Sequence, residues 1–539
     1  MPTLNFKGKT FVQNHHLAVP YHQLIPIKEK SLTDKVSLHD NLIIHGDNLI
    51  ALKALLPTYG GKIKFIYIDP PYNTGNESWV YSDNVSSPYI KEWFGKVVDK
   101  EDLTRHDKWL CMMVPRLKLL RELLDEDGVI FISIDENEQE RLRLILEEIF
   151  DENHIATFVW EGRSGKGGTT SKVEMNHEYI ECFAKDLNKV NVKPIIRIQG
   201  EGKYKDNQGN YSHEQLRQWG QGDKREDRPR MYFPIETPDG NFTYPIKADG
   251  TEGRWRFGEG SVRKMIENDD LDFVKQKDGK WEVYRKIRAG KERLSAADSI
   301  IDNAGTASSG TIELKKIFNG KKVFDTVKPS KLIKYLIDLI SWQDNNIIIL
   351  DSFAGSGTTA HSVLDTNKQD GMQRKFILIE MEDYADKITA ERVRRVIKGV
   401  KSTKDENLRK GLGGSFSYFE LGDAIELENI LHGRKMPSYN ALARYVFYTS
   451  TGEEFDEKKI NKKIKFIGAS KEYDIYMHYE PDVEKLKKMA FTLDMAKSLP
   501  KTKKKNLVFA PTKYIDNDSL QELKIEFCQL PFEIYRMKK

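Results

Sequence analysis

The sequence alternates short apolar runs with longer amphipathic segments, and this alternation limits the fold more than any other feature. The runs "FIYI" (65–68) and "VIFI" (129–132) contain no charged side chain. The segment between them carries apolar residues at helical spacing, namely Leu110, Met113, Leu117, Leu120 and Leu124. Buried strands that alternate with helices form mostly parallel, doubly wound sheets. We therefore expect an α/β protein whose ligands bind at the carboxyl ends of the strands.

One apolar strand ends in the stretch "FIYIDPPYNTG" (65–75), where Asp69 is followed by Pro70, Pro71 and Tyr72. Both prolines fix φ and neither donates a backbone hydrogen bond, so the polar groups beside them are held rigidly. A carboxylate and a phenol at the end of a buried strand stand where such sheets bind their ligands. The stretch predicts a catalytic site rather than an ordinary strand-end turn.

A second segment of the same kind begins near residue 325. The stretch "NNIIILDSFAGSGTTAHSVL" (345–364) reads as a strand, a glycine-rich turn and a helix. Gly355 and Gly357 allow the backbone to turn tightly and to approach a ligand closely. Glu380 ends the next apolar run, and a carboxylate about 20 residues after such a turn suits the hydroxyls of a ribose.

The chain between these two segments changes in character. It is polar and glycine-rich and mixes basic with aromatic residues, as in "EGRWRFGEGSVRKM" (252–265). We expect an inserted domain there. The organisation that the sequence predicts is a catalytic half over 1–185, an insert over 186–322, a cofactor half over 323–400, a charged linker over 401–422 and a small C-terminal α/β domain over 423–539.

Composition excludes several classes of protein. The 86 basic residues against 82 acidic ones leave a net charge of +4, so any surface for a polyanion must be local. Cys111, Cys182 and Cys528 lie far apart without a CxxC pair, which argues against a disulfide framework and against a zinc site. No apolar run approaches the roughly 20 residues of a membrane span, and the first residues lack a signal-peptide core. We expect a cytoplasmic protein without a metal or a membrane partner.

The motifs "DPPY" (69–72) and "DSFAGSGTT" (351–359), in these strand-end positions, resemble those of DNA amino-methyltransferases that use S-adenosylmethionine. The catalytic motif precedes the cofactor motif, which is the order of the β class. The resemblance implies a circularly permuted, Rossmann-like methyltransferase sheet with an inserted target-recognition domain. The phrases "YPIKADGTEGRWRFG" (244–258) and "GGSFSYFELG" (413–422) are similar to those of modification (Mod) subunits of type III restriction–modification systems.

This resemblance implies particular site residues. Asp69, Pro70, Pro71 and Tyr72 would be catalytic. The cofactor would be bound by Asp47, Lys328, Asp351, Phe353, Ala354, Gly355, Gly357, Thr358 and Glu380. Two of these keep a structural alternative, since Asp47 suits the N-cap of a helix and Lys328 suits a solvated helix start.

The chemistry of an adenine amine explains why a rigid carboxylate is needed. The amine is a poor nucleophile because its lone pair is delocalised into the ring. Asp69 and the carbonyl of Pro70 can each accept one amine N–H, which favours a tetrahedral nitrogen with its lone pair aimed at the methyl group. The base must first be flipped out of the duplex, and Tyr72 offers a face for stacking.

The resemblance therefore implies a sequence-specific DNA methyltransferase that modifies the N6 amine of adenine in double-stranded DNA, as the modification subunit of a type III system. It also implies a homodimer and a separate helicase–nuclease restriction subunit, with residues 423–539 serving dimerisation or partner binding. A solitary adenine methyltransferase, a cytosine-N4 DNA methyltransferase and an RNA amino-methyltransferase remain alternatives.

Overall fold

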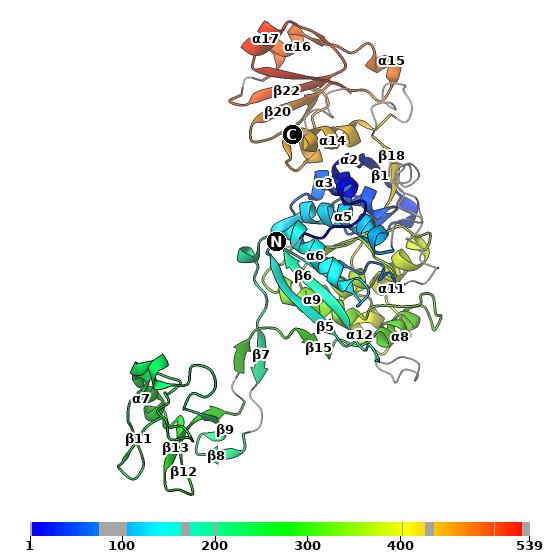
Figure 1. The fold of residues 1–539 in the computed structure, drawn as a ribbon. Helices are drawn as coiled ribbons and strands as arrows, with labels where there is room; N and C mark the ends of the chain where they lie inside the picture. The colour runs from blue at the N-terminus through cyan, green and yellow to red at the C-terminus, as the bar shows by residue number, and fades with distance from the viewer. Residues whose placement is uncertain are drawn as a thin grey trace. The chain divides into compact units, whose positions relative to one another are not determined.

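The chain forms two compact units, Met1–Val192 with Asp298–Lys539, and Lys193–Ala297. Both units are drawn in Figure 1. The computed structural model describes residues 3–74, 105–162, 173–198, 202–290, 292–401, 403–425, 436–500 and 502–530.

A ten-stranded sheet forms the centre of the first unit. In order across the sheet, its strands are β1 (His22–Pro26), β18 (Ser417–Ala424), β2 (Leu42–His45), β17 (Lys375–Glu380), β16 (Ile348–Asp351), β3 (Ile63–Ile68), β4 (Leu124–Ile134), β6 (Glu178–Ala184), β5 (His154–Trp160) and β15 (Ile300–Ile301). The six strands from β18 to β4 are parallel. The α/β class predicted from the sequence is confirmed.

The sheet is mixed rather than wholly parallel. Strand β5 lies two places from β4, and β6 occupies the place between them and runs antiparallel to both. Strand β1 is also antiparallel to its neighbour β18. The antiparallel course of β6 brings its first residue, Glu178, to the edge where the parallel strands have their carboxyl ends.

Pairing between β16 and β3 joins the two halves of the sheet that the sequence separates. Ile349 lies opposite Phe65, and Leu350 lies opposite Ile66. The loops that follow these two strands therefore leave the same edge of the sheet as neighbours. The "DPPY" stretch and the glycine-rich turn are thus placed side by side by backbone pairing.

Helices cover the sheet. They are α1 (Lys9–Val12), α2 (His15–Ala18), α3 (Asn48–Tyr59), α5 (Arg105–Leu123), α6 (Gln139–Phe150), α8 (Ala307–Ile317), α9 (Ser330–Ser341), α10 (Thr358–Asp370), α11 (Glu391–Lys398) and α12 (Glu406–Lys410). Helix α3 packs on α5 and α5 packs on α6, whereas α9 packs on α10. One buried cluster joins Ile66, Ile132 and Leu350 of the sheet to Leu52, Leu117 and Leu146 of α3, α5 and α6.

The second unit, Lys193–Ala297, has its own small core. Its four-stranded sheet consists of β12 (Leu271–Lys275), β13 (Trp281–Arg288), β9 (Gly209–Gln215) and β8 (Tyr204–Asp206). It also contains α7 (Glu259–Glu267), the pair β10 (Ile235–Glu236) and β11 (Phe242–Thr243), and the pair β7 (Ile195–Ile198) and β14 (Glu292–Ser295). Trp255, Phe233 and Val283 belong to its buried cluster. The unit is shorter than the insert predicted over 186–322, because β15 and α8 lie with the first unit.

The C-terminal residues build a second sheet within the first unit. Its strands are β19 (Phe466–Ala469), β20 (Tyr473–Met477), β22 (Lys505–Ala510) and β24 (Ile525–Gln529). The smaller elements around it are α14 (Tyr439–Thr451), α15 (Val483–Leu486), β21 (Phe491–Thr492), α16 (Leu493–Ser498), β23 (Lys513–Tyr514) and α17 (Asn517–Glu522).

Two features tie this region to the large sheet. Residues 417–424, which the sequence places in a linker over 401–422 and just beyond it, form β18 and pair with β2, so the expectation of a linker is wrong there. Helix α14 packs on α3, and Leu442 of α14 shares one buried cluster with Leu55 and Tyr59 of α3. The C-terminal region is therefore continuous with the core of the large sheet.

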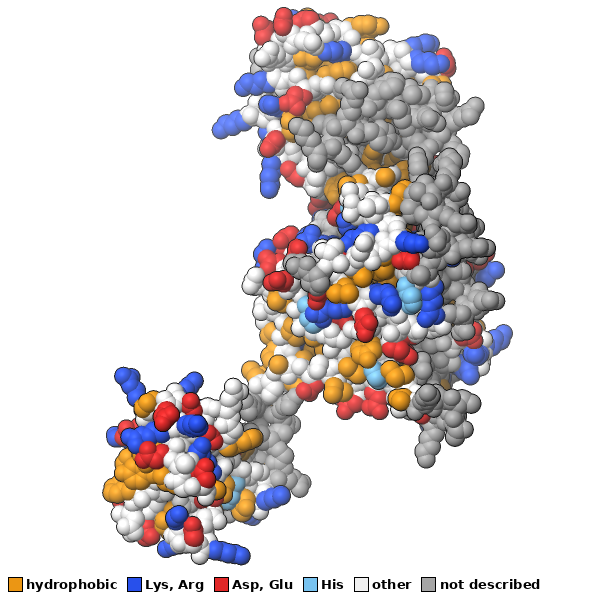
Figure 2. Space-filling view, viewed as in Figure 1, with side chains coloured by type: hydrophobic (Ala, Val, Ile, Leu, Met, Phe, Trp, Pro, Cys, Tyr) orange, Lys and Arg blue, Asp and Glu red, His pale blue; other side chains and the backbone are white. Residues whose placement is uncertain are grey.

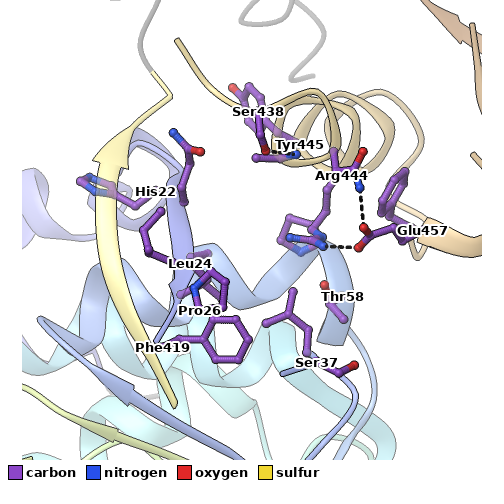
Figure 3. Close-up of a pocket in the computed structure, with 18 of the residues that line it drawn as sticks. His22, Leu24, Pro26, Ser37, Thr58, Phe419, Ser438, Arg444, Tyr445 and Glu457 are labelled. Carbon is purple, nitrogen blue, oxygen red and sulfur yellow. Dashed lines mark hydrogen bonds and ion pairs between the residues drawn. The ribbon is translucent and has the colours of Figure 1, made fainter. Parts of the chain in front are cut away.

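A cleft of about 660 Å³ lies where α14 approaches β1, residues 35–39 and the end of α3 (Figure 3). Arg444 of α14 lines this cleft and donates a hydrogen bond to Glu457 at 3.0 Å. None of the site residues predicted from the sequence lines this cleft.

Among the described residues, no helix is long and apolar enough to span a bilayer. Across the same residues, no group of three or more His, Cys, Asp or Glu side chains is arranged to hold a metal ion.

The shared core generates a stability prediction. Leu442→Ala removes a fully buried side chain between α14 and α3, and we expect it to lower the free energy of unfolding by about 2–5 kcal/mol. The measurement is urea unfolding followed by circular dichroism. Leu187→Ala, at a side chain that is 42% exposed, is the matched control. Equal unfolding midpoints for the two variants would contradict a shared core.

Candidate active site

The "DPPY" stretch follows β3 directly and is held on both sides. The carbonyl oxygen of Pro71 accepts a hydrogen bond from Nε1 of Trp109 on α5, at 2.7 Å. Asn73 adopts a φ of 56°, in the left-handed region, and its buried side chain donates to the carboxylate of Glu138. Backbone and side-chain contacts thus fix Asp69 and Tyr72 relative to the end of the strand.

Asp69 lies at the centre of a charged cluster. Nζ of Lys328 is 2.8 Å from each of its carboxylate oxygens. The hydroxyl of Tyr72 lies 2.8 Å from Oδ1 of Asp69 and 2.8 Å from the same Nζ. The Asp69 side chain is 31% exposed, whereas that of Lys328 is 7% exposed. Asp69 is therefore open to a ligand, and the ammonium group supports it from the buried side.

Glu178 completes the cluster, and the sequence analysis missed it. Its Oε2 lies 3.0 Å from the Tyr72 hydroxyl and 3.3 Å from Nζ of Lys328. The side chain of Trp160, which is opposite Glu178 across β5 and β6, places its ring 5.9 Å from the same Nζ. The signal for Glu178 was a carboxylate at the amino end of an apolar strand. It could be used only once that strand was known to run antiparallel.

Electrostatics decides the protonation of two members of the cluster. Burial lowers the pKa of Lys328, but the adjacent carboxylates of Asp69 and Glu178 outweigh it and raise that pKa above its usual value. Burial, with the same two carboxylates, holds the pKa of Tyr72 well above its usual value. At neutral pH the cluster therefore contains an ammonium group and a neutral phenol that can donate one hydrogen bond.

The glycine-rich turn after β16 is the second part of the site. Gly355 has a φ of 50° and Gly357 a φ of 77°, so both use backbone conformations that favour glycine. The N–H of Gly355 donates to Oε2 of Glu380 at 2.7 Å, and the N–H of Glu382 donates to its Oε1 at 3.0 Å. Burial raises the pKa of Glu380 to about 7. Glu380 thus braces the turn from the end of the neighbouring strand β17.

The other residues predicted for the turn are buried within or beside it. Asp351 accepts hydrogen bonds from the N–H of Phe353 at 3.0 Å and from the hydroxyl of Thr359 at 2.5 Å. Burial raises its pKa to about 7. The hydroxyl of Thr358 accepts a hydrogen bond from Arg392 at 2.7 Å, and Ala354 is buried. The Asp351 contacts hold the turn together from inside.

Asp47 has the structural role that the sequence left open. It is the N-cap of α3, accepting a hydrogen bond from the N–H of Leu49 at 2.8 Å. The next residue, Asn48, donates to the carbonyl oxygen of Ser352 at 2.9 Å. Arg116 of α5 donates to Asn48 at 2.5 Å and lies 3.4 Å from Asp47. The start of α3 is thus bonded to the glycine-rich turn.

A further buried network links the start of α9, two residues after Lys328, to the same turn. Glu313 of α8 accepts a hydrogen bond from the hydroxyl of Ser330 at 2.5 Å, at the start of α9. Arg392 of α11 lies 3.3 Å from Glu313 and also donates to Ser356 at 3.1 Å. These residues were not predicted, because they come from three helices that are distant in sequence.

The structure therefore brings the predicted residues into two adjacent groups. Asp69 and Tyr72 cluster with Lys328, which the sequence had assigned to the cofactor and which here contacts the carboxylate of Asp69. The turn over 351–358 forms the other group with Glu380. Their separation in the sheet is that of neighbouring strands, so a methyl donor on the turn and an amine at Asp69 would meet.

The chain is similar in sequence to known DNA-modifying proteins. The family model described as DNA methylase matches residues 63–391. The Mod subunit of the StyLTI type III restriction-modification enzyme of Salmonella typhimurium is 31% identical over 422 residues, covering 73% of this chain and 62% of that protein. The EcoPI Mod subunit of Escherichia phage P1 is 30% identical over 458 residues, which cover 76% of this chain and 70% of that protein. The chain spans about two thirds of the length of these two relatives.

A type II relative is matched over more of its length. The type II methyltransferase M.KpnI of Klebsiella pneumoniae is 32% identical over 371 residues, which cover 65% of this chain and 82% of that protein. The similarity therefore extends to enzymes of both restriction–modification types.

The raised pKa of Asp351 predicts how stability depends on pH. Between its pKa of 3.8 in the unfolded chain and about 7 in the folded one, only the folded state keeps the proton, so stability falls as the pH rises. Glu380 acts in the same direction. Asp351→Asn removes one of the two groups, and we expect a smaller fall in the free energy of unfolding between about pH 5 and 8. Urea unfolding across this range tests it, with exposed Asp302→Asn as the control. A fall as large as in the wild type would be inconsistent with this origin.

Proposed function

Because this chain belongs to the DNA methylase family, we propose that it is a sequence-specific methyltransferase that transfers a methyl group from S-adenosylmethionine to the N6 amine of a flipped adenine in duplex DNA. The observation that carries the proposal is the partly exposed Asp69 carboxylate, rigidly held on β3 beside the glycine turn of β16. Adenine is proposed over cytosine because the motif begins with Asp69 rather than serine.

The proposed reaction uses the groups around Asp69. Asp69 and the Pro70 carbonyl accept the two amine N–H groups and orient the nitrogen lone pair. That lone pair forms the new C–N bond while the electron pair of the broken S–C bond stays on sulfur. The nitrogen then carries a positive charge and an excess proton, which leaves to solvent past the exposed side of Asp69. A carboxylate held where positive charge develops stabilises the transition state.

Several residues fit S-adenosylmethionine, which supplies an electrophilic methyl group when bound. The turn at Gly355 and Gly357 allows close backbone approach, and Glu380 at the end of β17 suits ribose hydroxyls. Phe324 offers aromatic surface beside the turn, 3.6 Å from the position that a Cβ on Gly355 would take. The catalytic strand precedes the cofactor strand in the sequence, which supports the permuted β-class order.

The second unit is the proposed reader of DNA sequence. Lys193–Ala297 contains 22 Lys and Arg against 18 Asp and Glu, which accounts for the whole net charge of +4. Basic side chains are scattered over its visible face among hydrophobic ones (Figure 2). A cleft of about 580 Å³ in this unit is lined by Arg217, Lys247, Phe242, Tyr244 and Trp281. Basic and exposed aromatic side chains together suit contact with nucleic acid.

The partners are proposed from the relatives. The likeness to two type III Mod subunits supports a DNA substrate and a separate restriction subunit. We further propose a homodimer, with the region 423–539 as the docking domain. The protein would then act in the cytoplasm. The longer coverage of M.KpnI favours a second candidate, a solitary methyltransferase. Copurification of a nuclease subunit distinguishes the two.

The first functional prediction concerns the catalytic carboxylate. Asp69→Ala should lower the rate of methyl transfer by about 100-fold or more, because the amine loses its anionic acceptor. Cofactor affinity, measured by isothermal titration, should stay close to that of the wild type. The readout is incorporation of labelled methyl groups into duplex DNA, followed by nucleoside analysis for N6-methyladenine. Asp325→Ala, at a side chain that is 93% exposed, is the control. Near-normal turnover by Asp69→Ala would sink the assignment.

The second functional prediction concerns sequence specificity. Exchange of Lys193–Ala297 for the matching segment of a related enzyme should change the methylated sequence, because base-reading side chains travel with that unit. The pairing of β7 with β14 keeps the two ends of the segment together, so the large sheet should stay intact. Sequencing of modified bases is the test, and unchanged cofactor affinity is the control. Methylation of the original sequence after the exchange would assign the reading to another region.

A further inference from the structure

Two carboxylates share one ammonium group at the proposed site of methyl transfer. Nζ of Lys328 lies 2.8 Å from both oxygens of Asp69 and 3.3 Å from Oε2 of Glu178. The Tyr72 hydroxyl lies between the two carboxylates, at 2.8 Å and 3.0 Å. With both carboxylates ionised, the cluster carries one net negative charge.

The two carboxylates differ in exposure. The side chain of Asp69 is 31% exposed, whereas that of Glu178 is 7% exposed and lies behind Lys328 and Tyr72. An amine that enters the site can therefore contact Asp69, while Glu178 acts on it only through the groups between them. Glu178 is placed to change the charge that Asp69 presents.

The remaining ionisable groups near Asp69 do not replace Glu178. Tyr67 of β3 donates or accepts a hydrogen bond with Ser133 at 2.8 Å, and burial holds its pKa well above the usual value, so it is neutral. Asp351 of β16 acts on Asp69 at longer range and is bonded to Thr359. The direct partners of the Lys328 ammonium in this cluster are thus Asp69, Glu178 and Tyr72.

Charge sharing matters because the reaction creates positive charge at the amine. A carboxylate that is fully paired with an ammonium group at 2.8 Å presents little net field to a third charge. A carboxylate that shares the ammonium group with a second anion keeps most of its negative field. Only the second kind can stabilise the cationic nitrogen strongly.

We propose that Glu178 is a positioning residue that divides the charge of Lys328, so that Asp69 meets the target amine as an anion that is held in place but not neutralised. The inference rests on the proposed methyl transfer. In this arrangement Lys328 holds Asp69 in place, and Glu178 keeps Lys328 from neutralising the charge of Asp69.

The proposal predicts that a second substitution restores part of the activity that a first substitution removes. Glu178→Gln keeps the size and the hydrogen-bonding capacity of the side chain but leaves Lys328 with Asp69 alone. The single-turnover rate of methyl transfer should fall about tenfold or more. Adding Lys328→Met to Glu178→Gln removes the neutralising cation and returns the net charge to −1, so the rate should rise above that of Glu178→Gln. If both side chains were merely structural, the second substitution would deepen the loss.

The experiment uses the full chain with labelled S-adenosylmethionine and duplex DNA. Lys328→Gln in the Glu178→Gln background repeats the test with a side chain that still donates hydrogen bonds. Glu178→Asp, which keeps the charge, should retain a rate near that of the wild type. Glu161→Gln, at an exposed residue after β5, is the matched control. Thermal unfolding and cofactor affinity are measured for each variant.

The outcomes separate this inference from the function on which it rests. Absence of adenine methylation by the wild type defeats the proposed function. If the wild type is active, two results would overturn the inference. One is a full rate for Glu178→Gln, and the other is a rate for both double variants below that of Glu178→Gln alone. Should neither double variant fold, the Glu178→Asp rate decides, because a loss as large as that of Glu178→Gln excludes a role for the charge.

Discussion

The pairing of β16 with β3 is the interaction on which the rest of the molecule depends. Ile349 and Leu350 lie opposite Phe65 and Ile66 in the middle of the ten-stranded sheet. Without this pairing, each half of the site would exist alone: a carboxylate without a methyl donor, or a donor site without an acceptor. Backbone hydrogen bonds, rather than contacts between side chains, therefore set the distance across which a methyl group would move.

Local sequence was sufficient for the central strands and for the two loops between which transfer is proposed. Continuous apolar runs identify β3, β4, β16 and β17, because a short segment that is apolar on both faces fits a strand buried inside a sheet. Asp69 and Gly355 stood out because prolines and glycines at strand ends constrain the backbone in recognisable ways.

Relations between distant segments were the part that local patterns could not supply. The direction of β6 decides whether Glu178 reaches the site, and that direction depends on where β5 lies in the sheet. The contact of Lys328 with Asp69 depends on packing among several elements, and so does the buried hydrogen bond between Asp351 and Thr359. Strand β18 lacked a helical or turn signal of its own and belongs to the sheet because β2 offers an unpaired edge.

The order of the strands also governs how the protein can be made. When a ribosome has synthesised β3 and β4, the far edge of β3 still has no partner, because β16 lies 284 residues behind it in the sequence. Strand β2 stays unpaired for longer, because its partners β17 and β18 begin only at Lys375 and Ser417. An unpaired apolar edge invites association with other chains, and late long-range pairing slows folding. Emerging chains of this protein therefore expose the edges of β2 and β3 until β16, β17 and β18 have been synthesised.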